Sequence, residues 1–336
     1  MFDIVFLGTS ASAPSIYRGL SAQVVMVRDH RFLIDCGEGT QRQILKSGIG
    51  FKRLNRILIT HGHLDHILGL AGMLSTFMRW EAIDEMEIWG SRHALNRVHD
   101  LLYGVVLMGR RPPMPIHLID LEPGVLLEDD YFTLSAFRVT HRGADAFGFA
   151  FEEKARRPFL NEKAEALGVP VGPERRLLVA GQPITLADGT VVHPDQVLGP
   201  AVRGARLVHV GDCGRTDDIQ DFVTGADCLV IEATYLDVEA DMARQFGHLT
   251  AAQAARLARD AGVRQLILTH VSRRYRERDI REEARAVFPD TEVARDFDRF
   301  TVLKHQPVRK VSTLGRALPQ PEEAEEAEEA EEAPES

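Results

Sequence analysis

Four potential metal ligands stand within six residues of this chain, directly after an apolar segment that is typical of a buried strand. The ligands are His61, His63, Asp65 and His66, and the strand is expected over 56–60. Imidazole and carboxylate side chains together suit zinc or a neighbouring first-row cation. Because a strand end is held stiffly and opens at the rim of a fold, we interpret the run as part of a metal site that substrate can reach. The weaker interpretation is a polar loop that happens to contain three histidines.

Other expected strands also end in ligand-type residues, and these complete the candidate site. Strands expected at 132–140, 206–210 and 265–269 are followed by His141, Asp212 and His270. With the first run, this makes seven candidate ligands. Seven is too many for one tetrahedral ion, and it fits two ions that share a carboxylate.

The order His-x-His-x-Asp-His, followed later by His, Asp and His, resembles the metallo-β-lactamase superfamily. Further segments make the chain similar to the ribonuclease Z family of tRNA 3′-processing endonucleases. These segments are 6–9, 33–43, 168–173, 211–212, 232–235 and 268–270. The resemblance extends over roughly residues 1 to 305. It is specific, because the Gly-Val-Pro-x-Gly-Pro segment and the Asp-Cys-Gly-Glu-Gly-Thr-Gln run are absent from most relatives in the superfamily.

The resemblance implies two zinc ions per chain and distributes the ligands between them. One ion takes His61, His63 and His141; the other takes Asp65, His66 and His270; and Asp212 bridges the two. Asp65 is also implied to accept a proton from the attacking water. Cys213, beside the bridging residue, is interpreted as a small buried thiol, because the ligand pattern is complete without it.

The resemblance further implies that His248, paired with Glu232, donates a proton to the departing ribose oxygen. The residues themselves place His248 just before a capping box formed by Thr250 and Gln253, at the start of a helix expected over 251–261. The positive end of that helix would attract an RNA phosphate. On the residues alone, His248 is equally well a surface residue of the capping region.

Strands and helices alternate along most of the chain. Strands are expected at 2–7, 22–27, 31–34, 56–60, 86–89, 132–140, 147–151, 206–210, 228–232 and 265–269, and helices at 41–47, 68–79, 92–102, 251–261 and 280–288. Two similar halves that both deliver ligands from strand ends indicate two sheets packed between helices. We therefore expect an α/β protein with the αββα metallo-β-lactamase sandwich over residues 1–305.

Residues 152–203 interrupt this alternation with six prolines, several glycines and several basic side chains. Composition alone allows a surface excursion with a solvated basic face. The resemblance implies an inserted basic arm that grips the body of the tRNA, in a homodimer in which the arm of one chain serves the site of the other.

Residues 306–336 are expected to form an acidic tail that is disordered from about residue 319. Nine glutamates and no basic residue stand between 319 and 336, so this segment accounts for most of the net charge of −10. Repeated Glu-Glu-Ala offers no apolar face to bury, which favours solvated disorder. The rest of the chain is nearly neutral, and RNA binding has to depend on local patches.

Cellular location can be inferred from three further features. No apolar segment approaches the roughly 20 residues of a membrane span, and the N-terminus has no basic segment typical of a signal peptide. Only three cysteines are present, an odd number at wide spacing, which argues against a disulfide framework. A cytoplasmic protein without membrane contact is therefore expected.

The leading hypothesis is a zinc-dependent endoribonuclease that removes the 3′ trailer from precursor tRNA and leaves a 3′-hydroxyl. The alternative keeps the fold and the metals but acts on cyclic nucleotides or other small phosphodiesters. A third possibility is a non-catalytic RNA-binding protein, against which the complete ligand set argues.

Two segments depart from the family pattern. His-Leu-Thr at 248–250 replaces His-Ser-Thr, and Pro-Ser-Ile-Tyr-Arg-Gly at 14–19 replaces Pro-x-Lys-x-Arg-Asn. In the family, the second loop helps to discriminate against CCA ends. Because this loop differs here, the resemblance does not imply that this protein discriminates against CCA ends.

Overall fold

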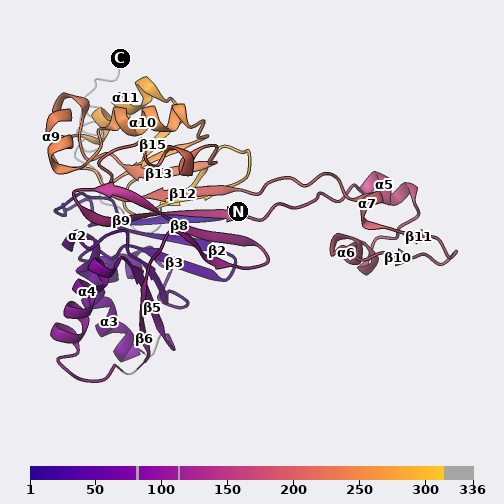
Figure 1. Ribbon diagram of the computed structural model, residues 1–336, viewed down its shortest axis with the longest axis horizontal. Coiled ribbons are helices and arrows are strands. Elements are labelled where there is room, and N and C mark those ends of the chain that lie inside the picture. The colour runs from indigo at the N-terminus through magenta and orange to yellow at the C-terminus, as the bar shows by residue number, and fades with distance from the viewer. Residues whose placement is uncertain (81–82, 113, 314–336) are drawn as a thin grey trace, which may run out of the picture.

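Two β-sheets face each other, helices cover both outer faces, and a slender arm projects from one end, as Figure 1 shows for the computed structural model. The structure describes residues 1–80, 83–112 and 114–313. The expected αββα sandwich is confirmed. The acidic segment expected to be disordered from about residue 319 lies outside the described residues.

The first sheet has eight strands in the order β17-β16-β1-β2-β3-β4-β5-β6. Their bounds are β1 (Phe2–Gly8), β2 (Ala22–Val27), β3 (His30–Ile34), β4 (Arg56–Leu58), β5 (Met86–Gly90), β6 (Ile116–Asp120), β16 (Asp298–Val302) and β17 (Arg309–Thr313). Strands β3 to β6 are parallel neighbours. Because β17 pairs with β16, the sheet continues beyond residue 305, where the sequence had suggested that the domain ends.

The second sheet has seven strands in the order β15-β14-β13-β12-β9-β8-β7. Their bounds are β7 (Gly124–Glu128), β8 (Phe132–His141), β9 (Ala144–Glu153), β12 (Arg206–Val210), β13 (Cys228–Glu232), β14 (Leu266–Thr269) and β15 (Thr291–Val293). Strands β12 to β15 run parallel, whereas β7, β8 and β9 are antiparallel. The carboxyl ends of the parallel strands therefore open at one edge, as expected for the candidate ligands.

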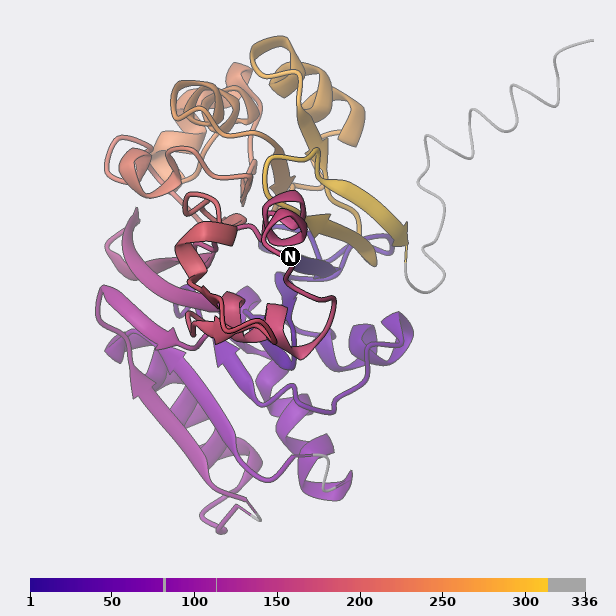
Figure 2. The ribbon, with the colours of Figure 1, turned by 90° about the vertical axis from the view of Figure 1, so that its right-hand side faces the viewer.

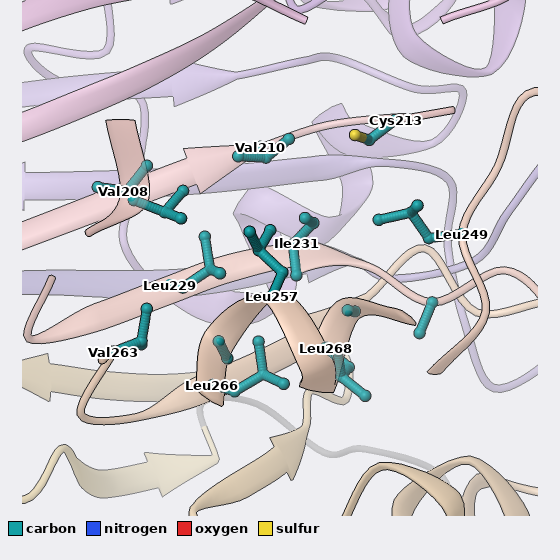
Figure 3. Packing of buried hydrophobic residues seen from close by; sticks show 14 of the residues in the cluster. Val208, Val210, Cys213, Leu229, Ile231, Leu249, Leu257, Val263, Leu266 and Leu268 are labelled. Carbon is teal, nitrogen blue, oxygen red and sulfur yellow. The ribbon is translucent and has the colours of Figure 1, made fainter. Parts of the chain in front are cut away.

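Helices on the first sheet are α1 (Thr40–Ser47), α2 (Leu64–Ile67), α3 (Gly69–Trp80) and α4 (Arg92–His99), which continues as a π-helical segment, η1 (Asp100–Val106). Those associated with the second sheet are α8 (Gln220–Val223), a 3₁₀ turn η2 (Asp237–Glu239), α9 (Ala240–Phe246), α10 (Ala251–Asp260) and α11 (Glu277–Val287). The amphipathic pattern that predicted a helix over 251–261 is explained by α10, because its alanines and Leu257 are buried against β13 and β14. Figure 3 shows this packing, with Leu257 beside Leu229 and Ile231.

Aromatic side chains fill the layer between the two sheets. Phe32 contacts Phe132 and Phe151 edge-to-face, with ring centroids 6.1 and 5.5 Å apart. Phe2 reaches the same two rings from strand β1 of the same sheet. These contacts join strands from both sheets, so the sandwich that carries the site is held by one continuous apolar layer. No helix among the described residues is long and apolar enough to cross a membrane.

The inserted arm consists of a stalk and a small folded head. The head contains α5 (Asn161–Ala166), α6 (Pro173–Val179), β10 (Ile184–Thr185), β11 (Val191–Val192) and α7 (Pro194–Val197). These elements enclose their own apolar cluster, which includes Ala164, Leu178, Val192 and Val197. Figure 2, viewed from the arm side, shows the head in front of the sandwich. The proline-rich segment thus projects from the surface and also has a small hydrophobic core of its own.

The arm is not basic as a whole, which corrects the expectation from its lysines and arginines. Seven basic side chains between residues 152 and 203 are matched by seven acidic ones. Several basic groups also stabilise the arm itself. Arg157 pairs with Asp195 and donates to the carbonyl of Gly199 at 2.8 Å, and Arg175 donates to the carbonyls of Pro170 and Val169. Any RNA contact must therefore come from particular cations rather than from net charge.

Candidate metal centre

The seven candidate ligands come together at the edge where the parallel strands end. Mutually close ligand atoms form one group of His61, His63, His141 and Asp212 and a second group of Asp65, His66 and His270. A third group overlaps with these and joins Asp212 and His270 with His248. His141 ends β8, Asp212 follows β12, and His270 follows β14. The structure therefore brings the predicted residues into two groups, and Asp212 lies between them.

Close backbone approaches seat the ligand-bearing helix α2 against the loop after β3. An ideal Cβ on Gly37 would lie 2.5 Å from the carbonyl oxygen of Asp65, and one on Gly69 would lie 2.0 Å from the carbonyl oxygen of Gly37. Since real Cβ atoms do not tolerate such distances, both positions require glycine. The Gly37 position, within the 33–43 segment, thereby fixes the backbone that carries Asp65 and His66.

Asp212 directs its two carboxylate oxygens towards different ligand groups. Oδ1 lies 3.5 Å from Nε2 of His66 and 3.3 Å from Nε2 of His270. Oδ2 lies 3.6 Å from Nε2 of His61 and 3.7 Å from Nε2 of His141. With metal–ligand bonds of about 2.1 Å, two ligand atoms of a tetrahedral ion are roughly 3.4 Å apart. These spacings fit one ion in each group, with the carboxylate of Asp212 shared.

Four of the five histidine ligands are oriented through their Nδ1 atoms, which leaves Nε2 facing the centre. Nδ1 of His61 lies 3.1 Å from Oγ1 of Thr60, and that of His141 lies 2.7 Å from the carbonyl oxygen of Gly247. Nδ1 of His66 lies 2.7 Å from Oδ2 of Asp35, and Nδ1 of His270 lies 3.0 Å from Oγ1 of Thr234. His63 is the exception and presents Nδ1 to the centre, 2.8 Å from Nε2 of His61. Such outer contacts fix the ring orientation that metal binding needs.

Unpartnered buried atoms also indicate that a cation fits this cluster. Among the described residues, Nε2 of His66, Nε2 of His270 and Oδ1 of Asp212 are buried without a hydrogen-bond partner. An unsatisfied buried polar atom is costly unless another group, such as a metal ion, binds it. All three atoms lie where the two ligand groups meet.

The electrostatics of the cluster also suit a cation. Burial and neighbouring imidazoles lower the pKa of His61, and the pKa of His63 falls to about 4, so both rings are neutral and able to bind metal at neutral pH. Against the effect of burial, the carboxylates of Asp212, Asp35 and Asp65 raise the pKa of His66. Three carboxylates that converge on one buried ring create a negative potential that divalent cations would neutralise.

His248 lies beside the metal-ligand cluster and is bonded to Glu232. Its Nδ1 is 2.9 Å from Oε1 of Glu232 and 3.9 Å from Oδ2 of Asp212. Burial opposes a charged imidazole, but the Glu232 carboxylate prevails and raises the pKa of His248 to about 9. The expected capping box is confirmed, since Thr250 and Gln253 exchange hydrogen bonds. The raised pKa favours the protonated imidazole of His248 beside the carboxylate of Asp212.

Glu232 is itself fixed by donors from two further residues, one at each carboxylate oxygen. Its Oε1 accepts the backbone N–H of Cys213 at 2.6 Å, and its Oε2 accepts the hydroxyl of Thr234 at 2.6 Å. The Cys213 thiol donates instead to the carbonyl of Arg215, and burial raises its pKa. This supports the interpretation of Cys213 as a buried thiol rather than a ligand.

The sequence alone did not identify the roles of Asp35, Thr60 and Thr234. Asp35 accepts the backbone N–H of Thr60 at 2.8 Å and also contacts His66. Its position in the 33–43 segment, at the end of a strand, was a signal that could have identified it. Asp35 and His270 both adopt left-handed backbone conformations, with φ of 57° and 53°. Such strain in non-glycine residues clusters at functional sites.

Two packed sheets with this ligand cluster at their common edge define the class as the metallo-β-lactamase fold. A family model described as a beta-lactamase superfamily domain matches residues 168–271, and one described as anti-Pycsar protein Apyc1 matches residues 2–153. The short form of human tRNase Z superposes with a TM-score of 0.62 at 27% identity, covering 89% of this chain and 99% of that one. The Bacillus subtilis metallo-beta-lactamase fold protein YhfI has a TM-score of 0.63 at 17% identity, covering 89% and 98% of the two chains.

Curated relatives give a narrower identification. Ribonuclease Z of Bradyrhizobium sp. is 50% identical over 90% of this chain and 100% of its own length. Ribonuclease Z of Gemmatimonas aurantiaca is 38% identical over 87% of this chain and 93% of its own. The chain belongs to the ribonuclease Z family.

Proposed function

We propose that the protein is a zinc-dependent endoribonuclease that removes the 3′ trailer from precursor tRNA and leaves a 3′-hydroxyl on the tRNA. The observation that carries this proposal is the position of Asp212. Its carboxylate lies between two ligand groups and within 3.9 Å of the proton-donating His248. A site with two metal positions and an adjacent acid is suited to hydrolysis of a phosphodiester. Membership of the ribonuclease Z family supports precursor tRNA as the substrate.

We assign one zinc ion to His61, His63 and His141 and a second to Asp65, His66 and His270, with Asp212 shared. When bound, the metal pair supplies an activated water at neutral pH and positive charge that offsets the charge on the phosphodiester. The donor set of imidazoles and carboxylates is one that zinc favours.

Asp65 is the residue that we assign as proton acceptor for the attacking water. Burial alone would raise its pKa, but His66 and His270 outweigh burial and lower it, so Asp65 stays ionised. The backbone N–H of Ser12 donates to Oδ2 of Asp65 at 3.0 Å. That contact fixes the carboxylate and leaves its remaining lone pairs directed at the centre.

His248 is the residue that we assign as proton donor to the departing 3′-oxygen. A general acid must be protonated at working pH, and the pKa of about 9 meets this requirement. Glu232 holds the ring through Nδ1, so the proton available to substrate is on Nε2. Glu232 acts as the positioning partner of His248.

The geometry of the arm supports a homodimer in which each arm serves the other chain. In the β8–β9 ladder Phe132 pairs with Glu153, where the arm begins, whereas His141 pairs with Ala144 beside the metal centre. The arm and the site therefore stand at opposite ends of a ten-residue strand, roughly 30 Å apart. Figure 1 shows the arm pointing away from the end of the strands at which the metal centre lies. An arm so placed suits a tRNA that is bound across two subunits.

A cytoplasmic location is part of the same proposal. Cys36, Cys213 and Cys228 are free and buried, as is usual for proteins of a reducing compartment.

The test is cleavage of a precursor tRNA with a 3′ trailer, with end mapping of both products, before and after treatment with a chelator. We expect a single cut that leaves a 3′-hydroxyl, loss of activity with the chelator, and recovery on addition of zinc. An enzyme that hydrolyses a cyclic nucleotide or a small chromogenic phosphodiester but leaves the precursor intact would instead support the small-phosphodiesterase alternative. No hydrolysis of any phosphodiester would favour a binding protein.

A further inference from the structure

A cavity lies directly beside the metal centre, on the side of His63. It has a volume of about 380 Å³ and is lined by Gly62, His63, His93, Arg97, Arg142, Gly143 and Asp145. Arg97 and Arg142 belong to none of the candidate ligand groups. Because His63 lines both the cavity and the metal centre, a molecule bound at the metals would extend into this space or pass beside it.

Arg97 is built rigidly into the wall of this cavity. Its Nη1 donates to the carbonyl oxygen of Gly62 at 2.6 Å, within the ligand run itself. Helix α4 packs closely there, since an ideal Cβ on Gly62 would lie 3.0 Å from Cα of Ala94. A guanidinium has five N–H donors in a fixed fork. One contact therefore positions Arg97 and leaves donors for a ligand.

Arg142 approaches the cavity from the other side, directly after the ligand His141. Its guanidinium carbon lies 5.5 Å from the ring centroid of Phe246, a distance typical of a cation–π contact. The acidic group of the cavity, Asp145, is already paired with Nη1 of Arg138 at 3.0 Å. Among the described residues, Arg142 makes no ion pair with a carboxylate. The cavity thus presents two cations whose charge is not neutralised by an acid within it.

We propose that this cavity binds one backbone phosphate of the RNA, next to the phosphodiester that is cut. Arginine forks match the oxygens of a phosphate, whereas a nucleobase would need an aromatic face to stack on. Of the described residues that line the cavity, none is aromatic except histidine. The proposal rests on the proposed nuclease function and identifies Arg97 and Arg142 as the residues that set the path of the strand beside the cut.

The test combines a variant with a change in the RNA. Precursor tRNAs are prepared with a neutral methylphosphonate at either linkage that flanks the cut, or at a linkage several nucleotides into the trailer. At one flanking linkage we expect the holoenzyme to lose about 10–100-fold in kcat/KM, the usual value of a hydrogen bond to a charged group. Arg142→Met should lose a similar factor on the unmodified RNA and lose nothing further on that methylphosphonate RNA.

Arg92→Met is the matched control, because Arg92 lies on the same helix as Arg97, is exposed and pairs with Asp120 outside the cavity. This variant should remain fully sensitive to the neutral linkage. Arg97→Lys is a second variant, which keeps the positive charge and loses the forked guanidinium. Its zinc content reports whether the loop that carries the metal ligands is intact. The loss in kcat/KM from Arg142→Met could instead multiply with the loss from the neutral linkage at both flanking positions. The two changes would then act independently, and the proposal would be overturned.

A second measurement separates this proposal from the nuclease function. Short RNAs with and without the neutral linkage are tested as competitive inhibitors of chromogenic phosphodiester hydrolysis by the holoenzyme. An uncut precursor tRNA would contradict the nuclease function alone. The cavity proposal would then be supported if Arg142→Met abolishes the difference in Ki between the two RNAs, and it would be contradicted if that difference persists.

Discussion

Nδ1 of His66 lies 2.7 Å from Oδ2 of Asp35, a carboxylate that is fully buried beneath the metal-ligand cluster. The same carboxylate accepts the backbone N–H and the hydroxyl of Thr60. One side chain therefore fixes both the ring of a ligand and the segment that precedes the ligand run. Metal affinity should depend on Asp35 even though it is not a ligand.

Asp35→Asn is expected to weaken zinc binding about 10–100-fold, the usual effect of losing such an outer contact. The amide would direct an N–H at Nδ1 of His66 and so favour the tautomer with a proton on Nε2, which cannot bind metal. Competition with a chromophoric chelator measures the affinity. Asp227→Asn is the matched control, since Asp227 is equally buried but bonds to Arg203 near the arm. Equal affinity losses in both variants would contradict this role.

Asp212→Ala should remove zinc from both positions, because its two oxygens face different ligand groups. Elemental analysis is expected to find about two zinc ions per chain in the natural protein and far fewer in the variant. The exposed Asp217, in the same loop and paired with Arg215, serves as control. A fully active protein with one ion per chain would refute the dinuclear assignment.

His248→Ala is expected to slow cleavage of precursor tRNA by about 10²–10⁴-fold, the range for loss of a general acid. Zinc content should stay unchanged, because the assignment gives both ions their ligands without His248. Metal analysis is needed because His248 also lies close to Asp212 and His270. Single-turnover rates with parallel metal analysis decide the question. Loss of zinc would make His248 a ligand, whereas a near-normal rate would mean that another group protonates the leaving oxygen.

Glu232→Gln should move the alkaline limb of the pH–rate profile towards neutral pH. The Glu232 carboxylate outweighs burial and raises the pKa of His248 to about 9, so the protonated acid persists up to that pH in the natural protein. Without the negative charge the pKa falls, and the donor is lost at lower pH. An alkaline limb at the same pH in both proteins would show that it reports another group.

Lys163→Gln combined with Arg176→Gln tests whether the head contacts RNA. Both side chains are exposed on the head, and neither makes an ion pair among the described residues, unlike Arg157. The double variant should raise KM for precursor tRNA and reduce the salt slope of binding, because fewer counterions are released. An unchanged salt slope would contradict a role for these cations.

Removing the whole head provides a stronger version of this experiment. Arg156 and Val202 exchange backbone hydrogen bonds across the stalk, so a short glycine-serine turn in place of 158–200 leaves that pair intact. Hydrolysis of a chromogenic phosphodiester should survive, and mixed dimers with an Asp65→Ala chain should recover precursor tRNA cleavage. Equal loss on both substrates would indicate a damaged sandwich.

The ligand cluster could be predicted because each ligand run ends or follows an apolar strand. The first run follows β4 of the first sheet, and the later candidates stand at the ends of β8, β12 and β14 of the second sheet. His141 and Asp212 were found in this way. Asp35 was not, because its role depends on the parallel pairing of Leu33 with Ile57, which joins segments far apart in the sequence. Strands β6 and β7 were also missed, since they lie at sheet edges and all of their residues are half-exposed or exposed. A half-exposed edge strand has weak apolar alternation.

The arm shows another limit of prediction from sequence. Its lysines and arginines suggested a basic surface, yet Arg157 and Arg175 are used to hold the head together. A sequence reports which charges are present, but not which of them are already neutralised. Only the contacts separate Lys163 and Arg176 from the structural arginines of the same segment.

The separate apolar cluster of the head has a consequence for how the protein can change. A unit of roughly 40 residues with so small a core is at the margin of independent stability, so it can open locally while the sandwich remains folded. Insertions and substitutions in the head therefore do not propagate into the strands that hold the ligands. Evolution, or an engineer, can exchange the head and leave the ligand cluster intact.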